Sequence, residues 1–150
     1  FNFRPTEMQS AIGVVQLSKF PDFMKAREKN FKALFEEFSR YEDKFVLPRA
    51  LEKAEPCWFV FPLTIKEKAG FKRRELIDWY SRHKIETRYL LAGNILKHPP
   101  YENLEYKVAQ GLKNTDYIAE NSFFLGVYPG IDGQRMNFII DKTREFMHRK

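Results

Sequence analysis

The first residues of the chain carry the clearest candidates for ligand chemistry. Asn2 and Arg4 lie two residues apart, so in an extended segment both side chains point to the same side. Pro5 biases Arg4 toward that extended conformation. An amide and a guanidinium ahead of a helix start can together bind a phosphate group, because the guanidinium offers forked donors. The alternative is a turn that leads into a core helix, and the residues alone slightly favour this alternative.

A second group of candidate ligand-binding residues lies near the middle of the chain, between Thr87 and Asn94. Arg88 supplies a cation, Asn94 supplies an amide, and Gly93 breaks the pattern at the exit of a predicted strand, where ligands are often bound. The other interpretation is structural, with Arg88 paired to a carboxylate on a neighbouring helix. The residues alone favour neither interpretation. His98, which precedes two prolines, is a weaker site candidate.

The sequence lacks the motifs of a self-contained catalytic site. It has no glycine-rich phosphate loop, no Gly-x-Ser-x-Gly sequence and no pair of histidines at metal-ligand spacing. Cys57 is the single cysteine, which excludes an internal disulfide and a metal cluster built from this chain's thiolates alone. We expect Cys57 to be buried as a small apolar side chain. We therefore predict neither catalytic residues nor a metal site within this chain.

The candidate residues at the start of the chain precede a long helical region. Thr6 and Gln9 have the types and spacing of a capping box, in which each side chain bonds the other residue's backbone N–H. Apolar residues at helical spacing predict an amphipathic helix from Thr6 to about residue 19, and Pro21 is expected to break or kink the helical rod. A second helix is predicted from 22 to about 41. Its predicted apolar face comprises Met24, Phe31, Phe35 and Phe38.

The remaining elements predict a small sheet covered by helices. The segment 57–66 is rich in aromatic and β-branched residues and is the strongest strand candidate, with Pro62 placing it at an edge or a bulge. Shorter strands are predicted at 45–47, 85–90 and 122–127, and helices at 72–83, at 114–120 and after Asp132. This alternation indicates an α/β or α+β fold. We assign 1–42 to connecting helices and 43–150 to the sheet with its helices, within one domain.

The composition limits the classes of function. The formal net charge is +6 and the pI is near 9.4, which is compatible with a basic nucleic-acid-binding module. We favour the alternative that the basic residues are spread over solvated helix faces, because acidic residues are interleaved with them. No apolar run is long enough to span a bilayer and no secretory signal is present. We therefore expect a cytoplasmic protein that contacts neither membrane nor nucleic acid.

The sequence resembles the DegT/DnrJ/EryC1/StrS family of sugar enzymes that use pyridoxal phosphate. The first match is the segment from Asn2 to Leu17, with the pattern Asn-x-Arg followed by Thr-Glu-Met-Gln-x-Ala-Ile-Gly-x-x-Gln-Leu. Three further matches follow in the same order: Pro56-Cys57-Trp58-Phe59, Thr87-Arg88 to Gly93-Asn94, and Gly126-Val127-Tyr128-Pro129-Gly130. Together they span nearly the whole chain and are most similar to the sugar 3-dehydrase branch, in particular the CDP-4-keto-6-deoxyglucose 3-dehydrase type. One departure is Leu91, where some members have a Phe near the cofactor.

The resemblance implies a fold and a set of residue functions. The fold would be the small C-terminal domain of a fold type I pyridoxal-phosphate enzyme, and the chain would be a fragment of a longer polypeptide. Asn2, with Arg4 close by, would bind the cofactor phosphate of the neighbouring subunit in a homodimer. Arg88, Leu91 and Asn94 would contact the substrate, a nucleotide-linked 4-keto-6-deoxy sugar. That sugar would lose its C3 hydroxyl group during the biosynthesis of a deoxysugar for surface polysaccharide.

The catalytic groups that the resemblance implies lie outside this chain. They are a His in place of the usual Schiff-base Lys and the acid that pairs with the cofactor's pyridine nitrogen. In the CDP branch, the cysteines of a [2Fe–2S] cluster also lie upstream, and a reductase is the expected partner. The fragment alone would be inactive and would not bind the cofactor tightly. The alternative within the family is a sugar aminotransferase domain, although those members usually carry His-Tyr-x-Pro where this chain has Arg88-Tyr89-Leu90-Leu91.

Overall fold

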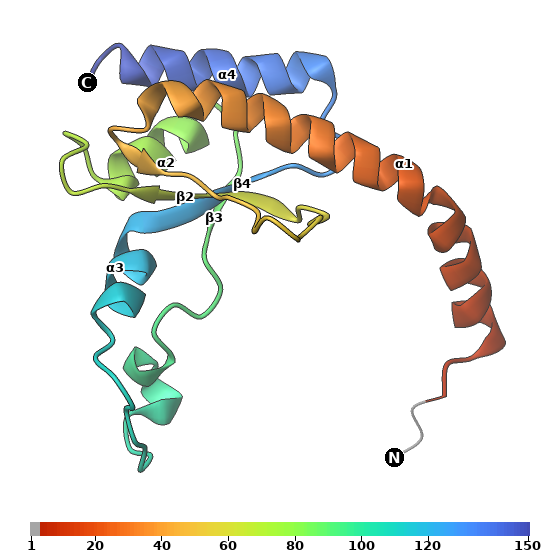
Figure 1. The fold of residues 1–150 in the computed structure, drawn as a ribbon, viewed down its shortest axis with the longest axis horizontal. Helices are drawn as coiled ribbons and strands as arrows, with labels where there is room; N and C mark the ends of the chain where they lie inside the picture. Colours follow the sequence, from red (N-terminus) through yellow and green to blue (C-terminus); the bar gives the residue numbers. More distant parts are fainter. Residues whose placement is uncertain (1–3) are drawn as a thin grey trace.

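The computed structural model describes residues 4–150, which form a four-stranded sheet with three helices on one face (Figure 1). The helices are α1 (Glu7–Phe38), α2 (Arg73–Arg82), α3 (Lys113–Asn121) and α4 (Gly133–Met147), with short 3-10 turns η1 (Ser39–Tyr41), η2 (Ile95–Lys97) and η3 (Pro99–Tyr101). The strands are β1 (Phe45–Val46), β2 (Val60–Ile65), β3 (Thr87–Tyr89) and β4 (Ser122–Gly126). Within the described range no helix has the length and apolar character needed to cross a membrane.

The sheet has the strand order β1-β2-β4-β3, and every neighbouring pair is antiparallel. Side chains alternate along a strand, so Phe61, Leu63 and Ile65 of β2 all turn to one face and are buried there. Phe123 and Leu125 of β4 are buried with them, under α1, α2 and α4. The sequence predicted an α/β or an α+β fold. An antiparallel sheet with its main helices on one face is an α+β fold, so this prediction is confirmed.

The strand β2 is shorter than predicted and is not an edge strand. It begins at Val60, so Cys57 lies in the preceding loop and is exposed, and the expectation of a buried Cys57 is wrong. Trp58 takes the inward position instead, with its ring stacked on Phe31 at 4.0 Å between centroids. The larger ring buries more apolar area than the thiol would, which favours this orientation of the loop.

Pro62 lies inside β2, where a proline removes one backbone donor. β1 pairs only with Thr64 and Ile65, so at Pro62 the neighbouring strand is β4 alone. One side of β2 is open at this position, which is the local condition that a proline in a strand requires. The prediction of an edge or a bulge at Pro62 was wrong, because β2 is an interior strand with an uninterrupted register, although the local physical reason for an edge position holds.

The helix α1 is one continuous helix of 32 residues, where two were predicted. The capping box is confirmed: the Gln9 backbone N–H donates to Thr6 Oγ1 at 3.3 Å, and the Thr6 N–H donates to Gln9 Oε1 at 2.8 Å. Pro21 lies inside the helix and does not break it, although α1 is visibly bent (Figure 1). Pro21 is exposed, so the carbonyl that lacks a donor can be solvated.

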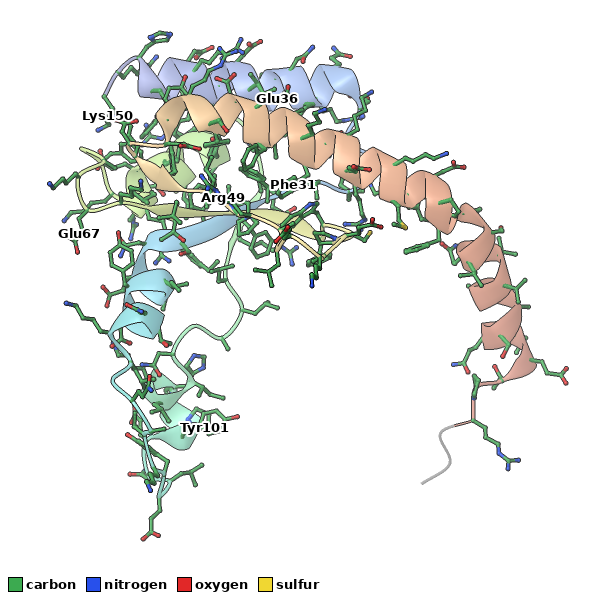
Figure 2. The ribbon with its side chains drawn as sticks, viewed as in Figure 1. Phe31, Glu36, Arg49, Glu67, Tyr101 and Lys150 are labelled. Atoms are coloured by element: carbon green, nitrogen blue, oxygen red, sulfur yellow. The ribbon has the colours of Figure 1, made fainter. Side chains whose placement is uncertain are left out.

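Only the last turns of α1 are buried. Its buried residues are Asn30, Phe31, Leu34, Glu37 and Phe38, and Figure 2 shows Phe31 between α1 and the sheet. The earlier turns extend past the sheet, so the apolar side chains there are exposed (Figure 1). They include Met24, which was predicted to face the core. We call Met8, Ile12 and Val15 the apolar stripe of α1, because their spacing places them on one face.

An ion pair with a buried carboxylate and a partly exposed arginine joins α1 to α4. Glu37 has a side chain only 3% exposed, and Arg144 binds it with two bonds, from Nε to Oε1 at 3.0 Å and from Nη2 to Oε2 at 2.7 Å. The Tyr41 hydroxyl donates to the same carboxylate at 3.4 Å. Burial and the charge of Glu37 raise the pKa of Tyr41, and the bond to Glu37 raises the pKa of Arg144. The pair is bidentate, which fixes the relative position of the two helices.

We predict that Arg144→Met destabilises the fold by about 1–3 kcal/mol, because it removes two bonds to the buried Glu37 carboxylate and leaves it with the more distant Arg40 and Tyr41. The double variant Glu37→Met/Arg144→Met should recover most of this loss, since it removes the buried charge as well. Urea unfolding of the chain measures both free energies. Equal stability of the single and double variants would contradict the prediction.

Candidate functional site

A cavity of about 1030 Å³ opens beside β3 and the end of β4. Aromatic rings line it from three separate parts of the chain, at Phe59, Tyr89 and Tyr128. The guanidinium groups of Arg27 and Arg88 belong to the same lining. Pockets for small ligands commonly have volumes of about 300–1,000 Å³, so this cavity is large enough for an extended ligand. Its combination of rings and cations suits a ligand with one planar or apolar part and one anionic part.

Arg88 lies on the edge strand β3 and binds Glu86 rather than a carboxylate of a neighbouring helix. Its Nε and Nη2 lie 2.9 and 2.8 Å from Glu86 Oε1. Both side chains are more than two-thirds exposed, at 71% and 74%. An exposed ion pair of this kind contributes little free energy, so a ligand phosphate can compete for the guanidinium. Leu91 lines the same cavity and is 85% exposed, so the structure brings Arg88 and Leu91 together.

Asn94 lies apart from Arg88 and Leu91, in the lining of a smaller cavity of about 390 Å³. It is 8% exposed and both ends of its amide are bonded. Nδ2 donates to Asp116 Oδ1 at 2.7 Å, and Oδ1 accepts from the backbone N–H of Leu96 at 3.1 Å, which caps η2. These bonds make Asn94 a fixed point of the loop after β3. A contact between Asn94 and a substrate stays a prediction.

The loop around Asn94 carries an ionic cluster. Lys97 Nζ lies 2.9 Å from Asp116 Oδ1. The bond from Asn94 and then the bond from Lys97 lower the pKa of Asp116, and the bond to Asp116 raises the pKa of Lys97. His98 bonds the carbonyl of Ala92 through Nε2, so this weaker site candidate also holds the loop.

The segment between Leu91 and Asn94 turns in an unusual backbone conformation. The Gly93 N–H donates to the Leu91 carbonyl at 2.6 Å, which closes a three-residue turn centred on Ala92. Ala92 has φ 56° and Gly93 has φ 60°, a region that non-glycine residues rarely adopt. A β-carbon on Gly93 would lie 3.1 Å from Ala119 Cβ, so this glycine also allows the loop to pack on α3. Strained turns of this kind concentrate at ligand-binding sites.

Arg4 stands at the other end of the molecule, just before the first turn of α1. It is exposed, and Figure 1 places this end of α1 away from the sheet. The N-terminus of a helix carries partial positive charge and outward backbone donors, so the arrangement suits a phosphate group. A phosphate bound there would not reach the cavity of the same chain. Asn2, the other predicted phosphate ligand, lies outside the described residues.

Sequence patterns alone missed Arg27, Phe59 and Tyr128 as cavity residues. The Phe59 and Tyr128 segments were singled out as motifs, but neither aromatic side chain was assigned to a site. Arg27 stands among interleaved acidic and basic residues, a pattern that predicts a solvated side chain instead. In the part of the chain that the structure describes, no three His, Cys, Asp or Glu side chains gather as a metal site would require.

Comparison with known proteins gives a consistent result. Residues 1–144 match the sequence profile of the DegT/DnrJ/EryC1/StrS aminotransferase family. Lipopolysaccharide biosynthesis protein RfbH of Salmonella typhimurium is 38% identical over 97% of this chain and 33% of its own length. The dTDP-4-dehydro-2,6-dideoxy-D-glucose 3-dehydratase of Saccharopolyspora spinosa is 37% identical over 98% of this chain and 32% of its own length.

A solved structure shares the fold as well as part of the sequence. It is an E. coli GDP-4-keto-6-deoxy-D-mannose-3-dehydratase with bound hydrated PLP. Its sequence is 29% identical to this chain, and the two structures superpose with a TM-score of 0.83 over 95% of this chain and 36% of that chain. The fold is therefore that of a domain in PLP-dependent enzymes of the aminotransferase type. The chain spans about a third of the length of the curated relatives it matches.

We predict a pH-dependent stability contribution from Asp116. Its folded-state pKa is lowered, so the contribution is present above the unfolded-state pKa of about 4 and is lost as pH falls through the folded-state pKa. Asp116→Asn should therefore lower the melting temperature at pH 7, and the difference from the wild type should shrink as the pH is lowered below about 4. Thermal unfolding across this pH range measures the effect. A difference independent of pH would contradict the prediction.

Proposed function

Since the chain belongs to the DegT/DnrJ/EryC1/StrS aminotransferase family, we propose that it is the C-terminal small domain of a nucleotide-sugar 3-dehydratase. The enzyme would remove the C3 hydroxyl group of a nucleotide-linked 4-keto-6-deoxyhexose, in the cytoplasm, for the biosynthesis of a polysaccharide deoxysugar. The observation that carries this proposal is identity of 38% and 37%, over nearly the whole chain, to a lipopolysaccharide biosynthesis protein and a sugar 3-dehydratase.

We assign the cofactor, pyridoxal phosphate or its pyridoxamine form, to a site that this chain completes but does not contain. When bound, the cofactor supplies an electron sink for the elimination. Arg4, together with Asn2, would bind the cofactor phosphate, and the N-terminus of α1 adds a favourable partial charge. Because the chain spans about a third of its relatives, the acid–base groups at the reacting carbon would belong to the rest of the polypeptide.

The large cavity would receive the substrate. Arg88 would leave Glu86 and bind a phosphate of the nucleotide, because phosphate offers two parallel hydrogen bonds while the exposed ion pair is weak. Leu91, exposed beside Arg88, would contact an apolar face of the sugar. Asn94 would meet the substrate from the adjoining smaller cavity.

A homodimer would bring Arg4 to the neighbouring subunit's cofactor. The early part of α1 exposes apolar side chains on more than one face: Met8, Ile12 and Val15 on one, and Leu17, Phe20 and Met24 on another. A helix that is apolar on several sides is normally enclosed by protein. We infer that the rest of the polypeptide and the partner subunit together enclose this part of α1.

We rank the sugar aminotransferase alternative below the dehydratase, because the relatives described above carry dehydratase names where an activity is given. In the CDP branch that the sequence resembles, a [2Fe–2S] cluster and a reductase complete the reaction. Cys57 is the single cysteine of this chain, so the ligands of such a cluster would come from elsewhere.

The test uses the intact polypeptide that contains this chain, supplied with pyridoxamine phosphate and with CDP-, GDP- or dTDP-linked 4-keto-6-deoxyhexoses. We expect mass spectrometry to detect loss of the C3 hydroxyl group from one of them. Glutamate-dependent formation of a 4-amino sugar would instead support the aminotransferase. Arg88→Met should raise KM by about tenfold or more, since a charged hydrogen bond contributes about 1.5–3 kcal/mol. Arg74→Met, a change at an exposed residue outside both cavities, is the control.

The proposed interface predicts that Ile12→Asp weakens the dimer of the intact polypeptide by about tenfold or more, because it places a charge in an apolar contact. Ser10→Asp adds the same charge at an exposed position on the side of α1 opposite the stripe and should leave the dimer intact. Sedimentation velocity at several concentrations measures both. Dimers of equal strength in the two variants would exclude the stripe from the interface.

A further inference from the structure

Two loops supply aromatic walls of the large cavity, and both loops are held by polar side chains of α1. We propose that Asn30 and Arg27 are positioning residues that hold Tyr128 and Phe59 as the surfaces on which the base of a nucleoside diphosphate stacks. The identity of that ligand rests on the proposed function. The positioning itself rests on the contacts described below.

Asn30 holds the turn that carries Tyr128. Its Nδ2 donates to the carbonyls of Tyr128 and Ile131, both at 3.1 Å, and lies 3.5 Å from the carbonyl of Val127. The Ile131 N–H bonds the Tyr128 carbonyl at 3.0 Å, which closes a β-turn with Pro129 in its first corner. One amide therefore fixes the turn from its buried side.

An asparagine at position 30 is an unfavourable choice for the helix alone. Asn has a lower helix propensity than Leu, and a buried amide costs free energy unless it is hydrogen-bonded. Asn30 is nevertheless only 5% exposed, because it lies next to Phe31 in the buried part of α1. Its bonds reach about a hundred residues along the chain, to a turn that lines a cavity. A residue whose only contribution was packing would not need these acceptors.

Arg27 holds the second loop, one turn earlier on α1. Its Nη1 donates to the carbonyls of Trp58 at 3.2 Å and Phe59 at 3.1 Å. The guanidinium carbon also lies 5.8 Å from the centre of the Phe59 ring. The adjacent Trp58 is stacked on Phe31, so the loop is fixed on both sides of Phe59. Phe59 is 70% exposed and is therefore presented to the cavity instead of being packed in the core.

Gly130 sets the orientation of the Tyr128 ring. A β-carbon on Gly130 would lie 2.3 Å from Tyr128 Cε2, so the ring lies directly over this glycine. Tyr128 is 56% exposed, which leaves one face of the ring available. The Tyr128-Pro129-Gly130 motif thus has a local explanation: the proline makes the turn, and the glycine makes room for the ring.

The chemistry of the lining indicates a base with attached phosphates. Exposed aromatic faces bind planar bases by stacking, with little dependence on the base, and arginines bind phosphates. Arg88 and Arg135 line the same cavity, and each is paired to a nearby exposed carboxylate, that of Glu86 and that of Asp132. A nucleoside diphosphate matches both parts of this lining.

The test titrates GDP, CDP and dTDP into the intact polypeptide without cofactor or sugar, with calorimetry as the readout. We expect one of these probes to bind the wild type, and Tyr128→Leu and Asn30→Leu each to weaken that binding by about tenfold. Because Asn30 acts through Tyr128, the double variant should bind no more weakly than either single variant. Asn30→Leu should also accelerate amide hydrogen exchange at 127–131, and Gly130→Ala should weaken binding without that acceleration.

Thr143→Val is the matched control, since it removes a buried hydroxyl that bonds Tyr80 and lies outside the cavity. It should lower stability and leave binding unchanged. The inference is overturned if Asn30→Leu binds as tightly as Thr143→Val, if the effects of Asn30→Leu and Tyr128→Leu add in full, or if no probe binds the wild type. If a probe binds in an Asn30-dependent way but the polypeptide does not catalyse C3 elimination, the proposed function is refuted and this inference stands. C3 elimination that is indifferent to Asn30→Leu would refute this inference alone.

Discussion

The packing of the last turns of α1 onto the sheet is the interaction on which the rest of the structure depends. Phe31 and Phe38 both contact the ring of Phe61 on β2, with centroids 5.1 and 5.5 Å apart, and Leu34 between them is fully buried. The same part of α1 carries Glu37, which binds α4, and Asn30, which binds the turn after β4. Burying the aromatic face therefore places the polar side chains where their partners are.

The two halves of α1 face different environments. The second half is packed on the sheet, while the first half exposes apolar residues such as Ile12 and Leu17. An exposed apolar helix is unfavourable in water, so it is consistent with a chain that spans about a third of its relatives. The segment from 95 to 112 also extends away from the sheet, and Figure 2 places Tyr101 on it. Exposed apolar side chains thus lie on the first half of α1, on the segment 95–112 and around the large cavity beside the sheet.

Local patterns predicted the elements well where local physics decides them. Asp132 caps α4, accepting from the Arg135 N–H at 2.8 Å, and Leu76 and Tyr80 of α2 are buried as their spacing indicates. The errors have physical causes. Pro21 costs α1 one hydrogen bond, which a long helix with a solvated bend absorbs. Cys57 is exposed because the neighbouring Trp58 gains more from burial.

The sequence by itself determined the capping box, the aromatic strand, the α+β class and the family resemblance, because these depend on residues close together in the chain or on the order of whole motifs. Only the tertiary structure decided that Arg27 meets Phe59, that Asn30 meets Tyr128, and that Asn94 lies apart from Arg88. Periodicity tells which side chains share a face of one element. It does not tell which distant carbonyl that face will meet, because this depends on the path of the whole chain around its core.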